Sequence, residues 1–170
     1  MAEHNPTNQV AYQPPAPDPE LRRLEPLLGT WQVTGWTEES LAGPAGPVTS
    51  SETFDWLDGG YFLVQTYQTI FGDSAPQTGV NYWGYDAEAD KFHIIFFSNN
   101  GPYTDKGNRY QGMVSDGKLT FTGPARFTIG LDADGKVQVN PDGAITFVWE
   151  LRDSDGVWRH WMDNTYTRVQ

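Results

Sequence analysis

Histidine is the side chain whose ordinary pKa lies nearest to neutral pH, and this chain contains three of them. His4 lies in a polar N-terminal segment and has no predicted role. His160 lies in an aromatic-rich stretch near the C-terminus, where an imidazole could orient a ligand, transfer a proton or ligate haem iron. It could equally make only a structural hydrogen bond to a neighbouring strand. His160 is therefore the candidate ligand contact and, if the protein is an enzyme, the candidate catalytic residue.

Other catalytic and metal-binding patterns are missing from the sequence. The chain has no cysteine, which excludes disulfides, thiolate catalysis and cysteine-ligated metals. It has no His-X-His or His-Glu-X-X-His spacing and no Gly-X-Ser-X-Gly elbow. The segments 132–135 and 153–156 begin like calcium loops but lack the closing glutamate, and most acidic residues lie in turns or at outward-facing positions. We therefore predict no metal site and no cofactor.

Charge and hydropathy narrow the range of partners. The formal net charge is -11, so the chain repels phosphate backbones and we expect no nucleic-acid binding. No apolar run approaches the roughly 18 residues of a membrane span, so we expect no membrane partner. The N-terminal sequence lacks the basic start and apolar stretch of a secretory signal, which predicts a cytoplasmic protein.

The chain divides into a tail and one domain. Residues 1–19 are polar and proline-rich, which predicts a disordered arm, whereas residues 20–170 have the composition of a single folded domain. A short helix should open the domain, because Asp18 is a good N-cap and Pro19 suits the first helical position. The leucines expected on its buried face are Leu21, Leu24 and Leu28.

After this helix the sequence alternates between apolar and polar residues, with turn sequences in between. The expected strands cover about 29–38, 50–57, 61–71, 79–86, 90–98, 106–114, 117–123, 125–131, 143–152 and 156–168. Hairpin-length links between so many strands predict an all-β fold, namely a closed antiparallel up-and-down barrel of about ten strands. A barrel interior widens with strand number, and about eight strands already leave room for one small ligand. We therefore expect a cavity.

Two ends of the chain carry a family resemblance. The segment Leu27-Leu28-Gly29-Thr30-Trp31 resembles the start of the calycin superfamily, which includes lipocalins and fatty-acid-binding proteins. In those folds the tryptophan packs at the closed barrel end against an arginine from the last strand. The resemblance implies that Trp31 and Arg168 form this structural pair.

A closer resemblance covers residues 20–170. Asp58-Gly59-Gly60 and Gly84-Tyr85-Asp86 resemble motifs of a lipocalin-like bacterial family known only as a domain of unknown function. That resemblance implies a barrel with an internal cavity and brings no catalytic residues. In outline the chain is also similar to the haem-binding nitrobindins, although Val33 stands where their starting motif has a glycine.

Alternation also predicts which side chains face the cavity. If Arg168 packs inside against Trp31, period two turns the even-numbered residues of the last strand inward and Trp161 outward. The candidate ligand-binding residues are His160, Met162, Asn164, Tyr166, Phe147, Trp149, Phe121 and Tyr110. Segment 90–98 is apolar on both faces, so a second copy of the chain, as a homodimer, or the N-terminal arm should cover its outer face. The inner faces of 61–71 and 90–98 stay unassigned.

These observations predict a protein that binds a small, largely hydrophobic or aromatic molecule in the barrel cavity. One alternative is a cofactor-independent enzyme of isomerase, cyclase or proton-transfer type that acts on such a molecule in the same cavity. A second alternative is a haem-binding barrel. A barrel filled by its own side chains would have no such function.

Overall fold

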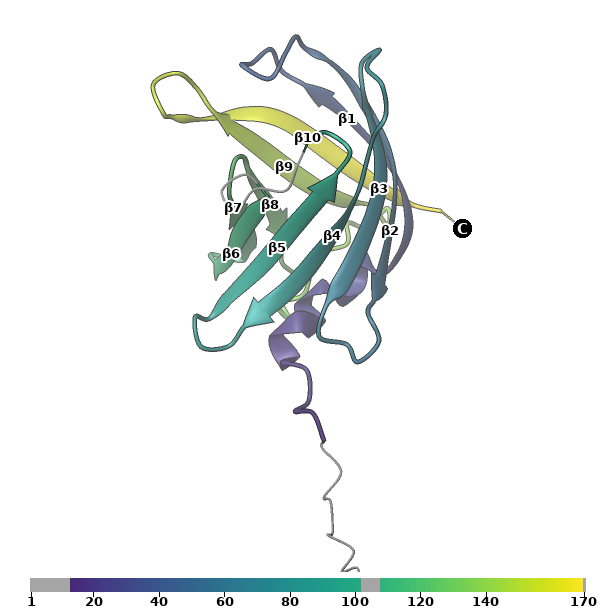
Figure 1. The fold of residues 1–170 in the computed structure, drawn as a ribbon, viewed down its shortest axis with the longest axis vertical. Helices are drawn as coiled ribbons and strands as arrows, with labels where there is room; N and C mark the ends of the chain where they lie inside the picture. The colour runs from purple at the N-terminus through teal and green to yellow at the C-terminus, as the bar shows by residue number, and fades with distance from the viewer. Residues whose placement is uncertain (1–12, 102–107, 170) are drawn as a thin grey trace, which may run out of the picture.

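The computed structural model describes residues 13–101 and 108–169, whose ten antiparallel strands form one closed barrel (Figure 1). Each strand pairs with its neighbours in the chain, and β1 also pairs with β10, which closes the sheet. The strands are β1 (Gly29–Thr37), β2 (Gly46–Trp56), β3 (Leu63–Phe71), β4 (Gln77–Asp86), β5 (Lys91–Ser98), β6 (Arg109–Ser115), β7 (Lys118–Thr122), β8 (Arg126–Gly130), β9 (Ile145–Arg152) and β10 (Trp158–Arg168). The predicted up-and-down barrel is confirmed.

The strand limits differ from the expected ones mainly at β2. This strand begins at Gly46 rather than near residue 50, because β1 continues to pair with it as far as Thr37 opposite Gly46. The first residues of the expected strand 106–114 lie outside the described part of the chain.

The element η1 (Pro19–Leu27) precedes the barrel, and its N-cap is the predicted one. The Asp18 carboxylate accepts a hydrogen bond of 2.9 Å from the Glu20 amide. The element is a 3₁₀ helix with about three residues per turn, so its buried face repeats every third residue. Its buried leucines are Leu21, Leu24 and Leu27, whereas Leu28 was expected in place of Leu27. Within the described residues, no helix has the length and apolarity that a membrane crossing needs.

The helix lies at one end of the barrel (Figure 1), and Trp31 and Arg168, the two residues that the resemblance paired, attach it there. The Trp31 indole donates a hydrogen bond of 2.6 Å to the Leu27 carbonyl. The Arg168 guanidinium lies over the Trp31 ring, 4.3 Å from its centre, and donates to the carbonyl oxygens of Leu28 and Pro26. These carbonyls end a helix, so Arg168 satisfies acceptors that the helix itself leaves open.

Replacing Arg168 with alanine should lower the free energy of unfolding by about 1–3 kcal/mol, because one cation–π contact and two charge-assisted hydrogen bonds disappear. Urea denaturation monitored by circular dichroism measures the change. Arg159→Ala is the control on the same strand, since Arg159 is 66% exposed and its ion pair with Asp153 should contribute less than about 1 kcal/mol. Equal losses in the two variants would contradict the role given to Arg168.

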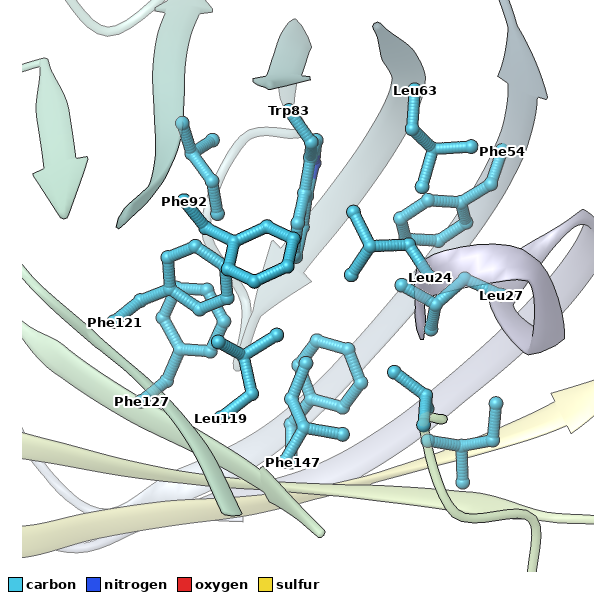
Figure 2. Packing of buried hydrophobic residues seen from close by; sticks show 14 of the residues in the cluster. Leu24, Leu27, Phe54, Leu63, Trp83, Phe92, Leu119, Phe121, Phe127 and Phe147 are labelled. Atoms are coloured by element: carbon cyan, nitrogen blue, oxygen red, sulfur yellow. The ribbon is translucent and has the colours of Figure 1, made fainter. Parts of the chain in front are cut away.

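Aromatic side chains fill the half of the barrel next to the helix (Figure 2). The Trp83 ring lies edge-on to Phe54, Phe121 and Phe127, with centroid distances of 5.9, 5.2 and 5.9 Å. Phe121 in turn stacks on Phe127 at 4.9 Å. Leu24 and Leu27 of η1 complete this cluster beside Phe54, so the helix end of the barrel is closed by packed side chains (Figure 2).

The apolar strand β5 turns Phe92, Ile94 and Phe96 toward the barrel interior. On its outer face Phe97 is 40% exposed, and its ring lies edge-on to Tyr82 of β4. Residues 13–18 of the arm lie elsewhere, since Pro15 accepts a hydrogen bond from the Tyr61 hydroxyl. Residues 1–12 lie outside the described part, so cover of β5 by the arm or by a second copy stays a prediction.

Candidate functional site

The half of the barrel away from η1 contains a cavity of about 350 Å³ that is partly open to solvent. This volume lies within the range of about 300–1,000 Å³ that is usual for small-molecule pockets. The described residues that line it are Glu52, Gln65, Tyr67, Thr69, Phe71, Gln77, Asn81, Trp83, Phe96, Ser98, Asn108, Tyr110, Pro124, Ala125, Phe127, Phe147, Trp149, Leu151, Trp161, Met162, Asn164 and Tyr166. The unassigned inner face of strand 61–71 is therefore its odd-numbered one.

Flat aromatic rings form much of the cavity wall. Phe147 stacks on Tyr166 at 4.4 Å, and Phe127 packs against Trp149 at 4.5 Å. Farther from the helix, Trp161 stacks on Phe71 at 6.0 Å. Such faces favour a flat, apolar occupant, because ring contacts stabilise beyond the area that they bury.

The floor of the cavity is a chain of polar side chains that rests on Trp83. The Trp83 indole N–H donates to Gln65 Oε1 at 3.0 Å, and Asn81 Nδ2 donates to the same oxygen at 2.8 Å. Gln65 Nε2 donates to Glu52 Oε2 at 2.6 Å. The four residues come from the neighbouring strands β2, β3 and β4, and strand alternation turns all of them inward.

This chain of hydrogen bonds fixes which amide atoms face which partner. An indole N–H can only donate, so the Gln65 atom that it meets must be the carbonyl oxygen. The Asn81 atom that shares this oxygen must then be its amino group, which leaves Asn81 Oδ1 without a partner although Asn81 is 1% exposed. Within the described part of the chain, two further buried cavity atoms lack a hydrogen-bond partner, Trp149 Nε1 and Asn164 Oδ1. Buried polar atoms are normally paired, so unpaired ones in a cavity mark positions where a ligand can bind.

Glu52 is the one acidic residue among the described residues that line the cavity. Burial raises the pKa of its carboxyl group, and hydrogen bonds from its neighbours offset only part of that rise. These neighbours are Gln65, Ser50 and Tyr166. Burial also raises the pKa of the Tyr166 hydroxyl well above its ordinary value, and the nearby Glu52 raises it further. The floor therefore favours the protonated form of both groups when nothing cationic lies beside them.

The raised pKa of Glu52 predicts a pH-dependent difference between the wild type and Glu52→Gln. The folded state holds the Glu52 proton more tightly than the unfolded state, so this group stabilises fully below its unfolded pKa and loses that contribution as pH rises toward its folded pKa. Glutamine keeps the hydrogen bond with Gln65 and cannot titrate. We expect urea denaturation at pH 4 to 8 to show Glu52→Gln becoming steadily more stable relative to the wild type. A difference that does not change with pH would contradict the assignment.

Six of the eight candidate ligand-binding residues line the cavity, namely Met162, Asn164, Tyr166, Phe147, Trp149 and Tyr110. Burial raises the pKa of the Tyr110 hydroxyl to about 12. Phe121 faces inward as expected, but it is fully buried between Trp83 and Phe127 in the packed half of the barrel and does not line the cavity.

The inward position expected for His160 is wrong. Its ring is 48% exposed, and its Nε2 atom lies 3.0 Å from the Asp163 carboxylate on the outer surface. The cause is a β-bulge, since His160 pairs with Glu150 and Met162 pairs with the adjacent Trp149, so Trp161 is the extra residue. A bulge inverts the alternation, which turns Trp161 into the cavity and His160 out of it. The enzymatic alternative thereby loses the residue to which a catalytic role was given.

Sequence reasoning missed the polar floor, because buried glutamate, glutamine and asparagine are uncommon. Glu52 is an exception to the expectation that most acidic residues lie in turns or face outward, since it is 5% exposed. The available signal was strand alternation, because each polar residue lies two positions from an apolar residue on the same strand and so shares its face. The pairs are Glu52 with Phe54, Gln65 with Leu63, and Asn81 with Trp83.

The described residues that line the cavity offer a haem iron no imidazole ligand. The described lining residues include no histidine, since His93 lies on the outer face, 3.9 Å from Asp86, and His160 also points outward. A tyrosine ligand would bind as the phenolate, and the raised pKa of Tyr166 disfavours that form. Across the described residues, no cluster of three or more acidic or histidine side chains could hold a metal ion.

Comparison with known proteins gives a family and a fold. A family model described as "Protein of unknown function (DUF1579)" matches residues 16–168. No curated protein matches the chain. Rv2717c from M. tuberculosis is a similar solved structure, with 15% identity over 91% of this chain and 99% of that chain and a TM-score of 0.59. A redesigned beta barrel, mFAP0, bound to DFHBI, matches with 20% identity over 84% of this chain and 99% of that chain and a TM-score of 0.39. The similarity to Rv2717c shows a shared fold.

Proposed function

Since this chain belongs to the DUF1579 family, described as proteins of unknown function, we propose a function from its own cavity, namely the binding of one small, largely hydrophobic or aromatic molecule. The observation that carries this proposal is a cavity of about 350 Å³ with largely aromatic walls, in which three buried polar atoms of the described residues lack partners. An interior of this kind suits an occupant that brings both ring surface and a few hydrogen bonds.

The contrast between the two halves of the barrel supports the proposal. Next to the helix, the side chains of Trp83, Phe121 and Phe127 pack with centroid distances between 4.9 and 5.9 Å. Beyond Trp83, rings such as Phe147 and Trp161 line a cavity instead of filling it. The side chains of this half therefore leave space for an occupant, whereas those of the other half do not.

Fluorescence titration with N-phenyl-1-naphthylamine, an uncharged aromatic dye, tests the proposal. We expect a saturable rise in emission with one dye molecule per chain, since the cavity holds one molecule of this size. Native mass spectrometry of the protein purified from its own host should also show a bound small molecule. A linear, unsaturable response to the dye, together with an unliganded mass, would contradict the proposal.

A further inference from the structure

Asn81 and Glu52 present oxygen atoms to an occupant at the deep end of the cavity. The Trp83 indole N–H and the Asn81 amino group both donate to Gln65 Oε1 and are therefore already paired. What remains toward the cavity is Asn81 Oδ1, which has no partner, and the carboxyl group of Glu52. Asn81 is 1% exposed and Glu52 is 5% exposed, so water is largely excluded from both.

The remaining unpartnered donor lies along the wall rather than on the floor. Trp149 Nε1 belongs to a ring that packs on Phe127 at 4.5 Å and lies edge-on to Trp161 at 6.5 Å. An occupant would therefore meet this N–H along its body. Its inner tip would meet the oxygens of Asn81 and Glu52.

The charges of the lining residues also favour an occupant with a positively charged hydrogen-bond donor. Glu52 is the only carboxylic acid among the described lining residues, and no lysine or arginine is among them. Burial disfavours the carboxylate when it stands alone, so a cation beside it would be strongly stabilising. The net charge of -11 also raises the concentration of cations near the protein.

We propose that the ligand is an aromatic molecule carrying an amino group, whose N–H donors bind Glu52 and Asn81 Oδ1 at the cavity floor while its ring lies between the aromatic walls. This inference rests on the proposed function and narrows it to a ligand class. Asn164 adds a further buried oxygen without a partner to the cavity lining, and this oxygen lies against Gly35 of the neighbouring strand β1.

Three probes of similar shape test this inference by isothermal titration calorimetry at pH 7. They are 1-naphthylmethylamine, the apolar 1-ethylnaphthalene and the anionic 1-naphthoate. We expect the amine to bind most tightly and the anion most weakly. In Glu52→Gln the preference for the amine over 1-ethylnaphthalene should fall roughly 10- to 100-fold, which is the usual size of a charge-assisted hydrogen bond. Asn81→Leu should reduce the same preference by a smaller factor.

The control variant is Glu88→Gln, which makes the same charge change at an exposed position and should leave the preference unchanged. Binding of 1-ethylnaphthalene reports whether each variant still has an intact cavity. Equal affinities for the amine and 1-ethylnaphthalene, or tightest binding of 1-naphthoate, would overturn the inference and leave the proposed function standing. If none of the three probes binds the wild type, the proposed function fails and the inference fails with it.

Discussion

Met162→Trp should weaken the binding of N-phenyl-1-naphthylamine at least about tenfold, because the larger side chain occupies space that the dye needs. Met162 lies on β10 opposite Trp149, is 4% exposed and lines the cavity. An indole at this position would extend into the cavity. The dye titration described above measures the loss, and far-UV circular dichroism shows whether the barrel is still folded.

The chain offers a matched control for this variant. Met113 is 57% exposed on the outside of β6, so Met113→Trp introduces the same side chain without entering the cavity. Its dye affinity should equal that of the wild type. Unchanged binding in a folded Met162→Trp variant would show that the dye binds elsewhere on the protein.

Trp83→Ala should lower the free energy of unfolding by about 3–5 kcal/mol, the usual cost of removing a large buried ring. Trp83 is 2% exposed and lies at the boundary between the packed half of the barrel and the cavity. Its loss removes ring contacts with Phe54, Phe121 and Phe127. It also removes the N–H that holds Gln65 in place, so the floor should lose its fixed orientation. Urea denaturation measures the stability change.

Trp36→Ala is the control for this second prediction. Trp36 belongs to β1, but its side chain is 55% exposed on the outer surface. Surface replacements of this kind usually change stability by less than about 0.5 kcal/mol. A loss in Trp36→Ala comparable to that in Trp83→Ala would mean that the interior cluster is not the main source of stability.

Alternation in the sequence predicted correctly which side chains of β9 face inward, but it predicted only part of the inner face of β10. On β9 the apolar residues Ile145 and Phe147 alternate with Thr146, so period two identifies the inner face directly. On β10 the same reasoning starts correctly from Tyr166 and fails beyond Met162, because the bulge at Trp161 inverts the alternation. A bulge is a relation between two paired strands, and nothing in the local sequence of β10 marks it.

The polar floor illustrates a different limit. Strand alternation alone predicts that Glu52, Gln65 and Asn81 face inward, but such polar side chains are uncommon in protein interiors. They are tolerated inside because they satisfy one another across three strands and hydrogen-bond to Trp83. The sequence does not show these hydrogen bonds, because they form only when folding brings residues of different strands together.

By itself, the sequence of this protein determined the all-β class, the number of strands and their up-and-down order, because alternation and turn residues are local patterns. The resemblance to the calycin superfamily also implied the contact between Trp31 and Arg168, which joins the first and last strands at the helix end of the barrel. Only the tertiary structure decided how the interior divides between packed rings and open space. That division depends on how side chains from different strands meet across the barrel, and no single stretch of sequence contains this information.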